Sequence, residues 1–197
     1  HEDIYQLRNG FDRIVDIIIY PENREDILDL INYAKSNNNI CIIPYGGGTN
    51  VTNALSCDKF EKRTIISLDM CRMNQIKWVN SKNNTAEVQA GIIGKDLDEN
   101  LRKYGYQTGH EPDSNEFSTL GGWIATSASG MKQAKYGNIE DIVLSVNFIT
   151  PTGELKKEDI FPRTSSNFNL KHLIIGSEGN LGIITSAVIR IHRVPEC

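Results

Sequence analysis

Three short segments of the sequence combine glycine with hydroxyl- and amide-bearing side chains, a composition suited to binding anions. They are residues 44–50, 118–123 and 178–182. Consecutive glycines that follow a strand allow successive backbone N–H groups to point into one concavity, which binds phosphate without a lysine. Glycine also lacks a β-carbon, so a diphosphate can approach the chain closely. The pattern predicts a phosphate or diphosphate held by loops, although residues 46–48 alone would fit a flexible turn equally well.

Spacing excludes two common nucleotide-binding motifs. The sequence contains no G-x-x-x-x-G-K-[ST] segment, which excludes a P-loop. Gly46, Gly47 and Gly48 do not fit G-x-G-x-x-G, and no clear helical pattern follows them. The residues by themselves therefore predict an anion held by loop amides and nothing more specific.

The first glycine loop is predicted to follow a strand–helix–strand unit. Residues 14–20 form a β-branched run ending at a proline, and residues 24–36 carry apolar side chains at helical spacing. Asn23 is a candidate N-cap, with Asp26 at the capping-box position. Residues 40–44 are predicted to form a buried strand that runs directly into the glycines. This order is typical of a βαβ unit.

The remaining sequence is richer in short strands and hairpins. Leu97, Leu101 and Tyr104 share one face of a predicted helix, and Gly105 is its candidate C′ residue. The stretch 109–130 is dense in glycine, serine and threonine and shows no sustained period. The predicted strands are runs of apolar or β-branched residues at 64–68, 75–80, 85–90, 141–150, 155–157, 173–175 and 182–190.

These elements predict an α+β fold of two lobes. The small βαβ lobe is expected at about residues 1–71, and a larger mixed or antiparallel lobe at about residues 72–197. The chain has 197 residues and a net charge of −4. It has no basic tract, so no nucleic-acid partner is predicted, and any phosphate must be held by local geometry rather than by a global positive field.

The spacing of the cysteines and the length of the apolar runs argue against metal-binding, disulfide-rich and membrane-spanning proteins. None of the four cysteines lies at C-x-x-C spacing, so neither a metal site nor a disulfide scaffold is predicted, and Cys41 is expected to be a small buried hydrophobe. The sequence opens on His1 without a signal-like leader, which predicts a fragment or a processed product. Its apolar runs are far shorter than the ~20 residues of a membrane span.

Six segments match one family of flavoenzymes in the right order and at matching spacing. They are residues 43–51, 108–114, 117–123, 128–132, 136–141 and 176–182. The segments T-G-H-E-P-D-S and Y-G-N-I-E-D are the specific ones, whereas P-x-G-G-G-T and E-G-x-L-G are shared by many FAD-binding proteins. Over nearly its whole length the chain resembles the alkyldihydroxyacetonephosphate synthase family of the vanillyl-alcohol-oxidase, or PCMH-type, FAD-binding group.

The resemblance implies non-covalent FAD, bound between the two lobes. It places His110 near the flavin as the one candidate for a catalytic role, although a histidine in a loop is by itself more often structural. The residues implied to bind FAD are Pro44, Tyr45, Gly46, Gly47, Gly48, Thr49, Asn50, Asp113, Ser114, Asn115, Glu116, Phe117, Ser118, Thr119, Gly121, Gly122, Thr126, Ser127, Ala128, Ser129, Glu178, Gly179, Asn180, Leu181, Gly182, Ile183 and Ile184.

Three of these positions depart from the family pattern. Ser127 stands where relatives usually have arginine, which removes one charged contact. Asn180 replaces a common threonine, and Asn50 replaces a common serine. Both amides can still form hydrogen bonds.

The resemblance also implies a reaction. The family exchanges the acyl group of 1-acyl-dihydroxyacetone phosphate for a fatty alcohol in ether-lipid synthesis, through a flavin N5 adduct and without net redox change. The family's C-terminal cap or substrate domain is absent from these 197 residues, so the chain alone is expected to bind FAD but to be inactive. A homodimer, an acyltransferase partner, peripheral membrane association and a peroxisomal location are implied for the full-length enzyme.

Two other functions remain open. A FAD-linked 2-hydroxy-acid dehydrogenase or oxidase, of the D-lactate or glycolate type, would share the P-x-G-G-G-T and E-G-x-L-G segments. A non-catalytic module that binds flavin or phosphate would need only the fold. Residues 108–114 and 136–141 favour the synthase.

Overall fold

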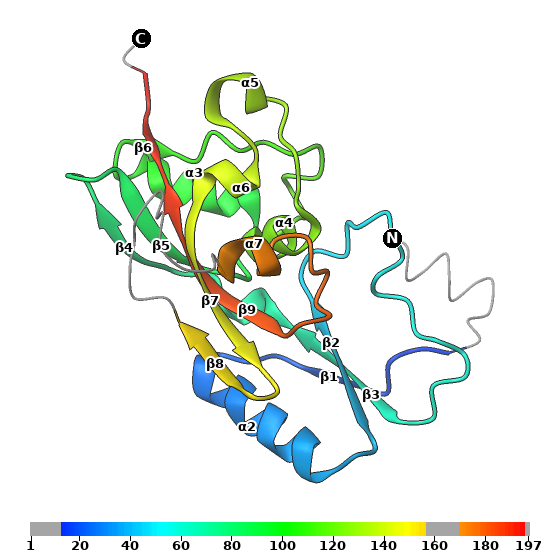
Figure 1. Cartoon of the computed structure of the whole chain (residues 1–197). Helices are drawn as coiled ribbons and strands as arrows, with labels where there is room; N and C mark the ends of the chain where they lie inside the picture. Colours follow the sequence, from blue (N-terminus) through cyan, green and yellow to red (C-terminus); the bar gives the residue numbers. More distant parts are fainter. Residues whose placement is uncertain (1–12, 157–169, 196–197) are drawn as a thin grey trace.

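The computed structural model of the protein describes residues 13–156 and 170–195, and it contains two main β-sheets (Figure 1). The small sheet is parallel, with the order β1–β3–β2. The large sheet is antiparallel, with the order β4–β5–β9–β7–β8, and a short ladder pairs β6 with β10. The strands are β1 (Ile17–Ile19), β2 (Ile40–Tyr45), β3 (Thr64–Asp69), β4 (Ile76–Asn80), β5 (Thr85–Gln89), β6 (Tyr106–Gln107), β7 (Val143–Thr150), β8 (Gly153–Lys156), β9 (Ile183–Arg190) and β10 (His192–Arg193). The predicted α+β class is confirmed.

The small sheet contains the predicted strand–helix–strand unit, with β3 inserted between its two strands. Helix α2 (Arg24–Ser36) has the predicted bounds. The Asn23 side chain accepts a hydrogen bond from the Asp26 amide (3.0 Å), and the Asp26 carboxylate accepts one from the Asn23 amide (3.2 Å). This reciprocal capping box satisfies amides that the first helical turn leaves unpaired.

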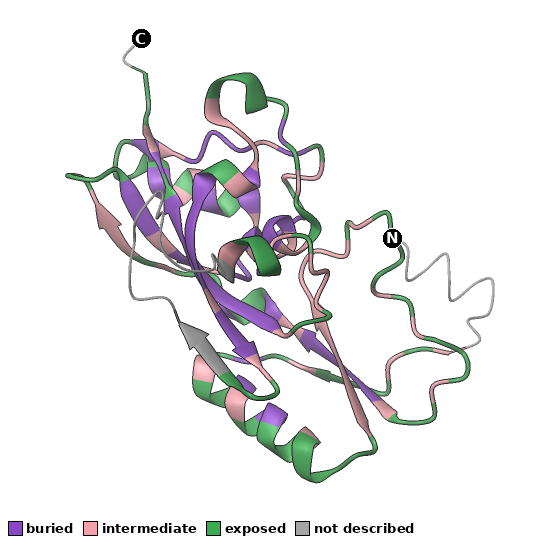
Figure 2. Cartoon of the chain, in the orientation of Figure 1, coloured by how far each residue is buried: buried purple, intermediate pink, exposed green. Residues whose placement is uncertain are grey.

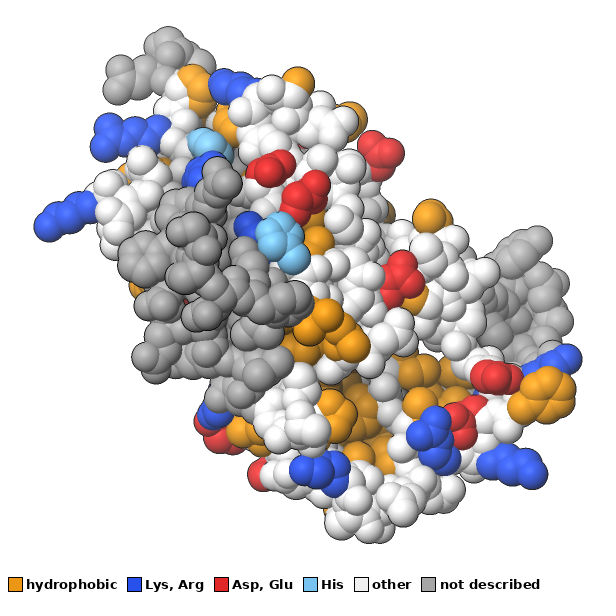
Figure 3. All heavy atoms as spheres, viewed as in Figure 1, with side chains coloured by type: hydrophobic (Ala, Val, Ile, Leu, Met, Phe, Trp, Pro, Cys, Tyr) orange, Lys and Arg blue, Asp and Glu red, His pale blue; other side chains and the backbone are white. Residues whose placement is uncertain are grey.

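Strand β2 is half-buried along its whole length, so the predicted burial of this strand is wrong. Cys41, expected in the core, is half-buried as well. The reason is the position of β2 at an edge of the sheet. Hydrophobic side chains also reach the surface over this sheet (Figure 3), and Ile17 and Ile18 on the other edge strand are about half exposed.

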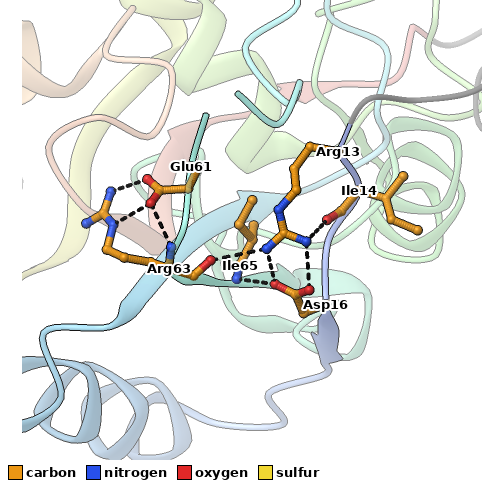
Figure 4. A network of polar contacts seen from close by, with 6 residues as sticks. All are labelled: Arg13, Ile14, Asp16, Glu61, Arg63 and Ile65. Atoms are coloured by element: carbon orange, nitrogen blue, oxygen red, sulfur yellow. Dashed lines mark hydrogen bonds and ion pairs between the residues drawn. The ribbon is translucent and has the colours of Figure 1, made fainter. Parts of the chain in front are cut away.

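An arginine–carboxylate contact fastens the chain before β1 to β3 (Figure 4). The Arg13 guanidinium donates to both carboxylate oxygens of Asp16, and the same carboxylate accepts the Ile65 amide at 2.7 Å. Arg13 also donates to the Arg63 carbonyl at 3.2 Å. The Arg13 hydrogen bond and the Ile65 amide lower the pKa of Asp16 to about 2. The contact therefore fixes the register at which β1 joins the sheet.

Helices cover one face of the large sheet, where the main core lies (Figure 2). The helices of this lobe are α3 (Gly94–Arg102), α4 (Leu120–Thr126), α5 (Gln133–Tyr136), α6 (Ile139–Ile142) and α7 (Leu170–Ile174). Leu97, Leu101 and Ile124 are fully buried against strand residues such as Phe148 and Ile189. This packing supplies the rigid support for the loops at the ends of the strands.

The two lobes pack against each other through a second core. It joins helix α2 to Met70 and Met73, at and beyond the short 3₁₀ helix η1 (Met70–Arg72), and to Ile149 and Ile183 at the ends of β7 and β9. The lobe boundary near residue 71 stays a prediction, because residues from both sides contribute to this core. No helix in the described parts of the chain is long and apolar enough to cross a membrane.

Three local predictions in the larger lobe are wrong. Residues 173–175, predicted as a strand, belong largely to helix α7. A short apolar run does not distinguish a strand from a buried helix by its period. Tyr104 lies beyond the end of α3 and is exposed, whereas Leu97 and Leu101 are buried as predicted. The aperiodic stretch 109–130 contains helix α4, which was not predicted. Lys157 and Cys197 lie outside the described residues.

Candidate functional site

A cavity of about 400 Å³ lies where the glycine loop after β2 meets the larger lobe. The loop after β2, the first turns of α4 and the segment before β9 form its walls. The predicted FAD-binding residues that line it are Pro44, Tyr45, Gly46, Gly47, Gly48, Thr49, Asn50, Ser114, Ser118, Thr119, Gly121, Gly122, Thr126, Ser127, Ala128, Ser129, Glu178, Gly179, Gly182, Ile183 and Ile184. The structure therefore brings the three glycine-bearing segments together, as expected for one ligand.

Four consecutive backbone amides in the glycine loop remain available for a ligand. The N–H groups of Gly47, Gly48, Thr49 and Asn50 donate no hydrogen bond to any residue that the structure describes. All four residues line the cavity. Gly47, Gly48 and Asn50 are half-buried and Thr49 is exposed, so these unpaired amides have the hydrogen-bonding capacity that an anion requires.

Close contacts explain why the loop consists of glycine. A β-carbon on Gly46 would lie 2.4 Å from the Thr119 hydroxyl oxygen, and one on Gly47 would lie 1.9 Å from the Phe117 carbonyl oxygen. Gly48 has a φ of +66°, which favours glycine. The loop is thus pressed against residues 117–119 of the other lobe, and larger side chains would push the two walls of the cavity apart.

Helix α4 begins at the cavity and orients its second wall. Thr119 is the N-cap, and its hydroxyl accepts a hydrogen bond from the Gly122 amide at 3.2 Å. A β-carbon on Gly121 would lie 3.0 Å from the Ala90 carbonyl oxygen, so the helix packs closely on the segment after β5. Trp123 follows in the first turn, is 2% exposed, and still forms part of the cavity wall.

Two residues in the left-handed backbone region line the cavity. Ser127 has a φ of 52° at the end of α4, and Glu178 has a φ of 48° in the loop after α7. The Glu178 amide donates to the Ala125 carbonyl at 2.8 Å, which joins the two segments. Non-glycine residues in this region are uncommon and occur often at functional sites.

The cavity wall holds almost no formal charge. Among the described residues that line it, Glu178 is the one charged side chain, and none is basic. A bound phosphate would therefore be neutralised by amide dipoles and not by lysine or arginine. The described residues also contain no group of three or more His, Cys, Asp or Glu side chains suited to a metal ion.

Some predicted residues lie beside the cavity without lining it. They are Asp113, Asn115, Glu116, Phe117, Asn180 and Leu181. Asp113, Glu116 and Phe117 are exposed, and the contribution of Phe117 is its backbone carbonyl against Gly47. The sequence motifs identify loops that meet at the cavity but do not show which of their side chains line it.

Other lining residues were not predicted. They are Val51, Thr52, Ala54, Leu55, Met70, Ala90, Pro112, Trp123 and Ala125. Most are apolar or small and reach the cavity through the fold. Val51, Pro112 and Trp123 lie within the motif segments 43–51, 108–114 and 117–123, and this membership is the signal that could have identified them.

His110 does not line the cavity. Its ring is 1% exposed and lies edge-on to Trp123, with ring centroids 4.9 Å apart and planes at 66°. Burial lowers the pKa of His110 to about 4, so the ring is neutral at pH 7. The structure thus places this histidine one side chain away from the ligand space, and its catalytic role stays a prediction.

Comparison with known proteins decides which ligand this cavity serves. A family model described as FAD binding domain matches residues 15–158. The chain belongs to this FAD-binding family. FAD is accordingly its cofactor, and the two-lobed PCMH-type fold agrees with the small parallel and large antiparallel sheets.

The FAD-binding domain has close relatives among named enzymes. It is 48% identical over 195 residues to alkyldihydroxyacetonephosphate synthase of Caenorhabditis elegans, covering 98% of this chain and 32% of that protein. It is 46% identical to the enzyme of the same name from Dictyostelium discoideum, with 98% and 31% coverage. A mitochondrial D-lactate dehydrogenase [cytochrome] of Arabidopsis thaliana is 30% identical, with 96% and 33% coverage.

A solved structure of alkyldihydroxyacetonephosphate synthase, in space group P212121, matches the fold with a TM-score of 0.85 and 46% sequence identity. The match covers 91% of this chain and 32% of that chain. The chain thus spans about a third of the length of the relatives that it matches.

The residues present fit FAD on structural grounds. The free amides of residues 47–50 suit the diphosphate. Gly46 and Gly47 lie so close to neighbouring atoms that a β-carbon on either residue would overlap them. The volume of the cavity lies within the range of cofactor and ligand sites, roughly 300–1,000 Å³. Apolar lining residues such as Ile183, Ile184 and Trp123 offer surface for the aromatic parts of a dinucleotide.

Proposed function

We propose that this chain is the FAD-binding domain of an alkyldihydroxyacetonephosphate synthase. The full-length enzyme would exchange the acyl group of 1-acyl-dihydroxyacetone phosphate for a fatty alcohol and so form the ether bond of ether lipids. When bound, FAD would supply the covalent chemistry of this exchange without net oxidation or reduction. The residues of this chain would bind the cofactor, orient it and exclude water from one side of it.

The observation that carries the proposal is the difference in identity among relatives. Identity to the synthases is 40–48% over the whole chain, whereas identity to the D-lactate dehydrogenases is 29–33%. Residues 108–114, the segment on which the resemblance to the synthase family mainly rests, include His110, whose ring packs on Trp123.

We propose that the loops that line the cavity contact different parts of FAD. The amides of Gly47, Gly48, Thr49 and Asn50 would bind the diphosphate of FAD. The segment 114–119 and the first turn of α4 would hold the opposite side, and residues 178–184 would cover the cofactor from the third wall. Asp113, Asn115, Glu116, Asn180 and Leu181 would act through loop conformation, because their side chains do not reach the cavity.

We also propose an oligomeric state, a partner and a location for the full-length enzyme. A homodimer, a partner acyltransferase, peripheral membrane association and a peroxisomal location are all inferred from the resemblance to the synthase family. The proposal also holds that the 197-residue chain is inactive alone, because it corresponds to about a third of its relatives' length.

The test uses the full-length protein with radiolabelled fatty alcohol and acyl-dihydroxyacetone phosphate. The proposal predicts incorporation of the alcohol into an ether-linked product, with release of the fatty acid. A parallel assay supplies D-lactate or glycolate with an artificial electron acceptor. Reduction of the acceptor without alkyl transfer would reject the synthase and favour the dehydrogenase, and neither activity would favour a non-catalytic flavin-binding module.

A further inference from the structure

The imidazole of His110 has an unusual environment for a polar ring. It is 1% exposed, and neither of its nitrogens has a hydrogen-bond partner among the described residues. Buried polar side chains are normally paired, so each exception requires an explanation. The contact that this ring does make is the edge-to-face packing on Trp123.

Trp123 is held on another edge by hydrogen bonds that lead to the glycine loop. Its Nε1–H donates to the Ser118 hydroxyl at 2.7 Å, and that hydroxyl donates to the Ser114 carbonyl at 2.9 Å. The Ser114 hydroxyl in turn bonds to the Thr49 hydroxyl at 3.3 Å. These hydrogen bonds therefore connect the indole to the glycine loop that lines the cavity.

Neighbouring backbone lies close to His110. Its amide donates to the Thr108 hydroxyl at 3.2 Å. On the other side lies Gly130, where a β-carbon would lie 3.0 Å from the His110 Nδ1 and 2.9 Å from the Glu111 amide nitrogen. Glycine at residue 130 therefore leaves space for the imidazole that a larger side chain would occupy.

We infer that His110 is a positioning residue, which fixes the Trp123 indole in the wall of the FAD cavity without touching the cofactor. The inference rests on the proposed FAD site. Edge-to-face packing is the favoured geometry of aromatic pairs, since the positive edge of one ring meets the π face of the other. A neutral ring with no competing hydrogen bonds can keep this geometry while Ser118 holds the indole nitrogen.

The fluorescence emission of Trp123 tests the inference. The sequence contains two tryptophans, so the Trp78→Phe variant leaves Trp123 as the one fluorescent indole. In this background we compare His110→Leu, which has similar volume but no aromatic ring, with His110→Phe, which keeps one. His192→Leu is the matched control, because His192 also packs on an aromatic ring, Tyr136, but does not line the cavity.

Tryptophan emission of the apo-protein and the Kd for FAD are measured for each variant. The inference predicts that His110→Leu shifts the Trp123 emission and weakens FAD binding by on the order of 10-fold, since an aromatic pair contributes up to about this much. His110→Phe is expected to restore both within about 3-fold, again on the scale of one aromatic contact. His192→Leu is expected to change neither.

The outcomes separate this inference from the FAD proposal. If His110→Leu keeps the emission and the affinity of the parent, or if His110→Phe behaves like His110→Leu, the positioning role is rejected while FAD binding stands. If the parent does not bind FAD, the proposed function fails, and the emission comparison alone then decides the role of His110. A His110→Leu protein that does not fold is replaced by His110→Met, to which the same criteria apply.

Discussion

The carbonyl oxygen of Phe117 lies 1.9 Å from the point that a β-carbon of Gly47 would occupy. This contact joins the glycine loop of the small lobe to the loop that precedes helix α4 in the larger lobe. The unpaired amides of this cavity-lining loop are therefore positioned by a contact between lobes, and glycine at residue 47 is required by packing.

Replacing Gly47 should damage FAD binding more than it damages the fold. In Gly47→Ala, the new methyl group forces the loop away from Phe117 and moves the adjacent free amides. We expect the Kd for FAD to rise by at least about 10-fold, equivalent to about 1.4 kcal/mol. Titration with FAD, followed by flavin fluorescence, measures the change.

Gly105→Asn is the matched control for this glycine. Gly105 has a positive φ, unlike Gly47, but a β-carbon there would contact nothing within 4 Å, and the residue does not line the cavity. Asparagine tolerates this backbone region. Equal affinities for the parent, Gly47→Ala and Gly105→Asn would show that the close contact is irrelevant to the ligand.

His110 should make the stability of the protein depend on pH. Burial lowers its pKa from 6.5 to about 4, so the unfolded chain binds a proton more readily between these values. The stabilising contribution is complete above pH 6.5 and is lost as the pH falls towards 4. At about 1.4 kcal/mol per pKa unit, the loss is about 3 kcal/mol.

Urea unfolding of the parent and of His110→Phe at several pH values between 4 and 7 isolates this contribution. Phenylalanine cannot titrate, so the difference in unfolding free energy between the two proteins should change with pH by about 3 kcal/mol. A difference that stays constant over this range would contradict the buried, neutral state of His110.

Asp16 should stabilise the protein at neutral pH and lose this effect in acid. Its pKa is lowered to about 2 by the Arg13 hydrogen bond and the Ile65 amide, so stability is lost as the pH falls from about 4 through about 2. Asp16→Asn is expected to lower the Tm at pH 7 and to match the parent more closely at pH 2. Glu25→Gln, which removes an exposed carboxylate bonded to neighbouring Arg24 in the first turn of α2, should lower the Tm less than Asp16→Asn does.

Ser127 offers a test of backbone strain at the cavity. Its φ of 52° is unfavourable for a residue with a β-carbon. Ser127→Gly should therefore raise the free energy of unfolding by about 0.5–1 kcal/mol, after the entropic cost of glycine is subtracted. Ser129→Gly, two residues along and without a positive φ, should lower stability, and an equal effect of the two substitutions would exclude relief of strain.

The sequence predicted the parts of the fold that depend on local patterns. Helix α2 was predicted with correct bounds, because Asn23 and Asp26 cap it and Ile27 and Ile31 repeat at helical spacing. The strands of the β4–β5 and β7–β8 hairpins were predicted from runs of apolar or β-branched residues. Helix α4 was missed because its glycines, Gly121 and Gly122, disfavour helices and are explained only by close packing on Ala90 and Thr119.

The site was predicted at the level of loops but not of side chains. Motifs located the three segments that meet at the cavity, since backbone amides and glycines leave a clear sequence pattern. They did not show that Asp113 and Glu116 point to solvent, or that Trp123 separates His110 from the ligand space. Those facts depend on how distant elements pack, which a local pattern does not contain.

The most direct test of this account is a calorimetric titration of the purified 197-residue chain with FAD, repeated with riboflavin, which lacks the diphosphate and the adenosine. If the free amides of residues 47–50 bind the diphosphate, FAD should bind at one per chain, and riboflavin should bind at least about 100-fold more weakly. No binding of FAD, or equal affinities for FAD and riboflavin, would contradict the central claim.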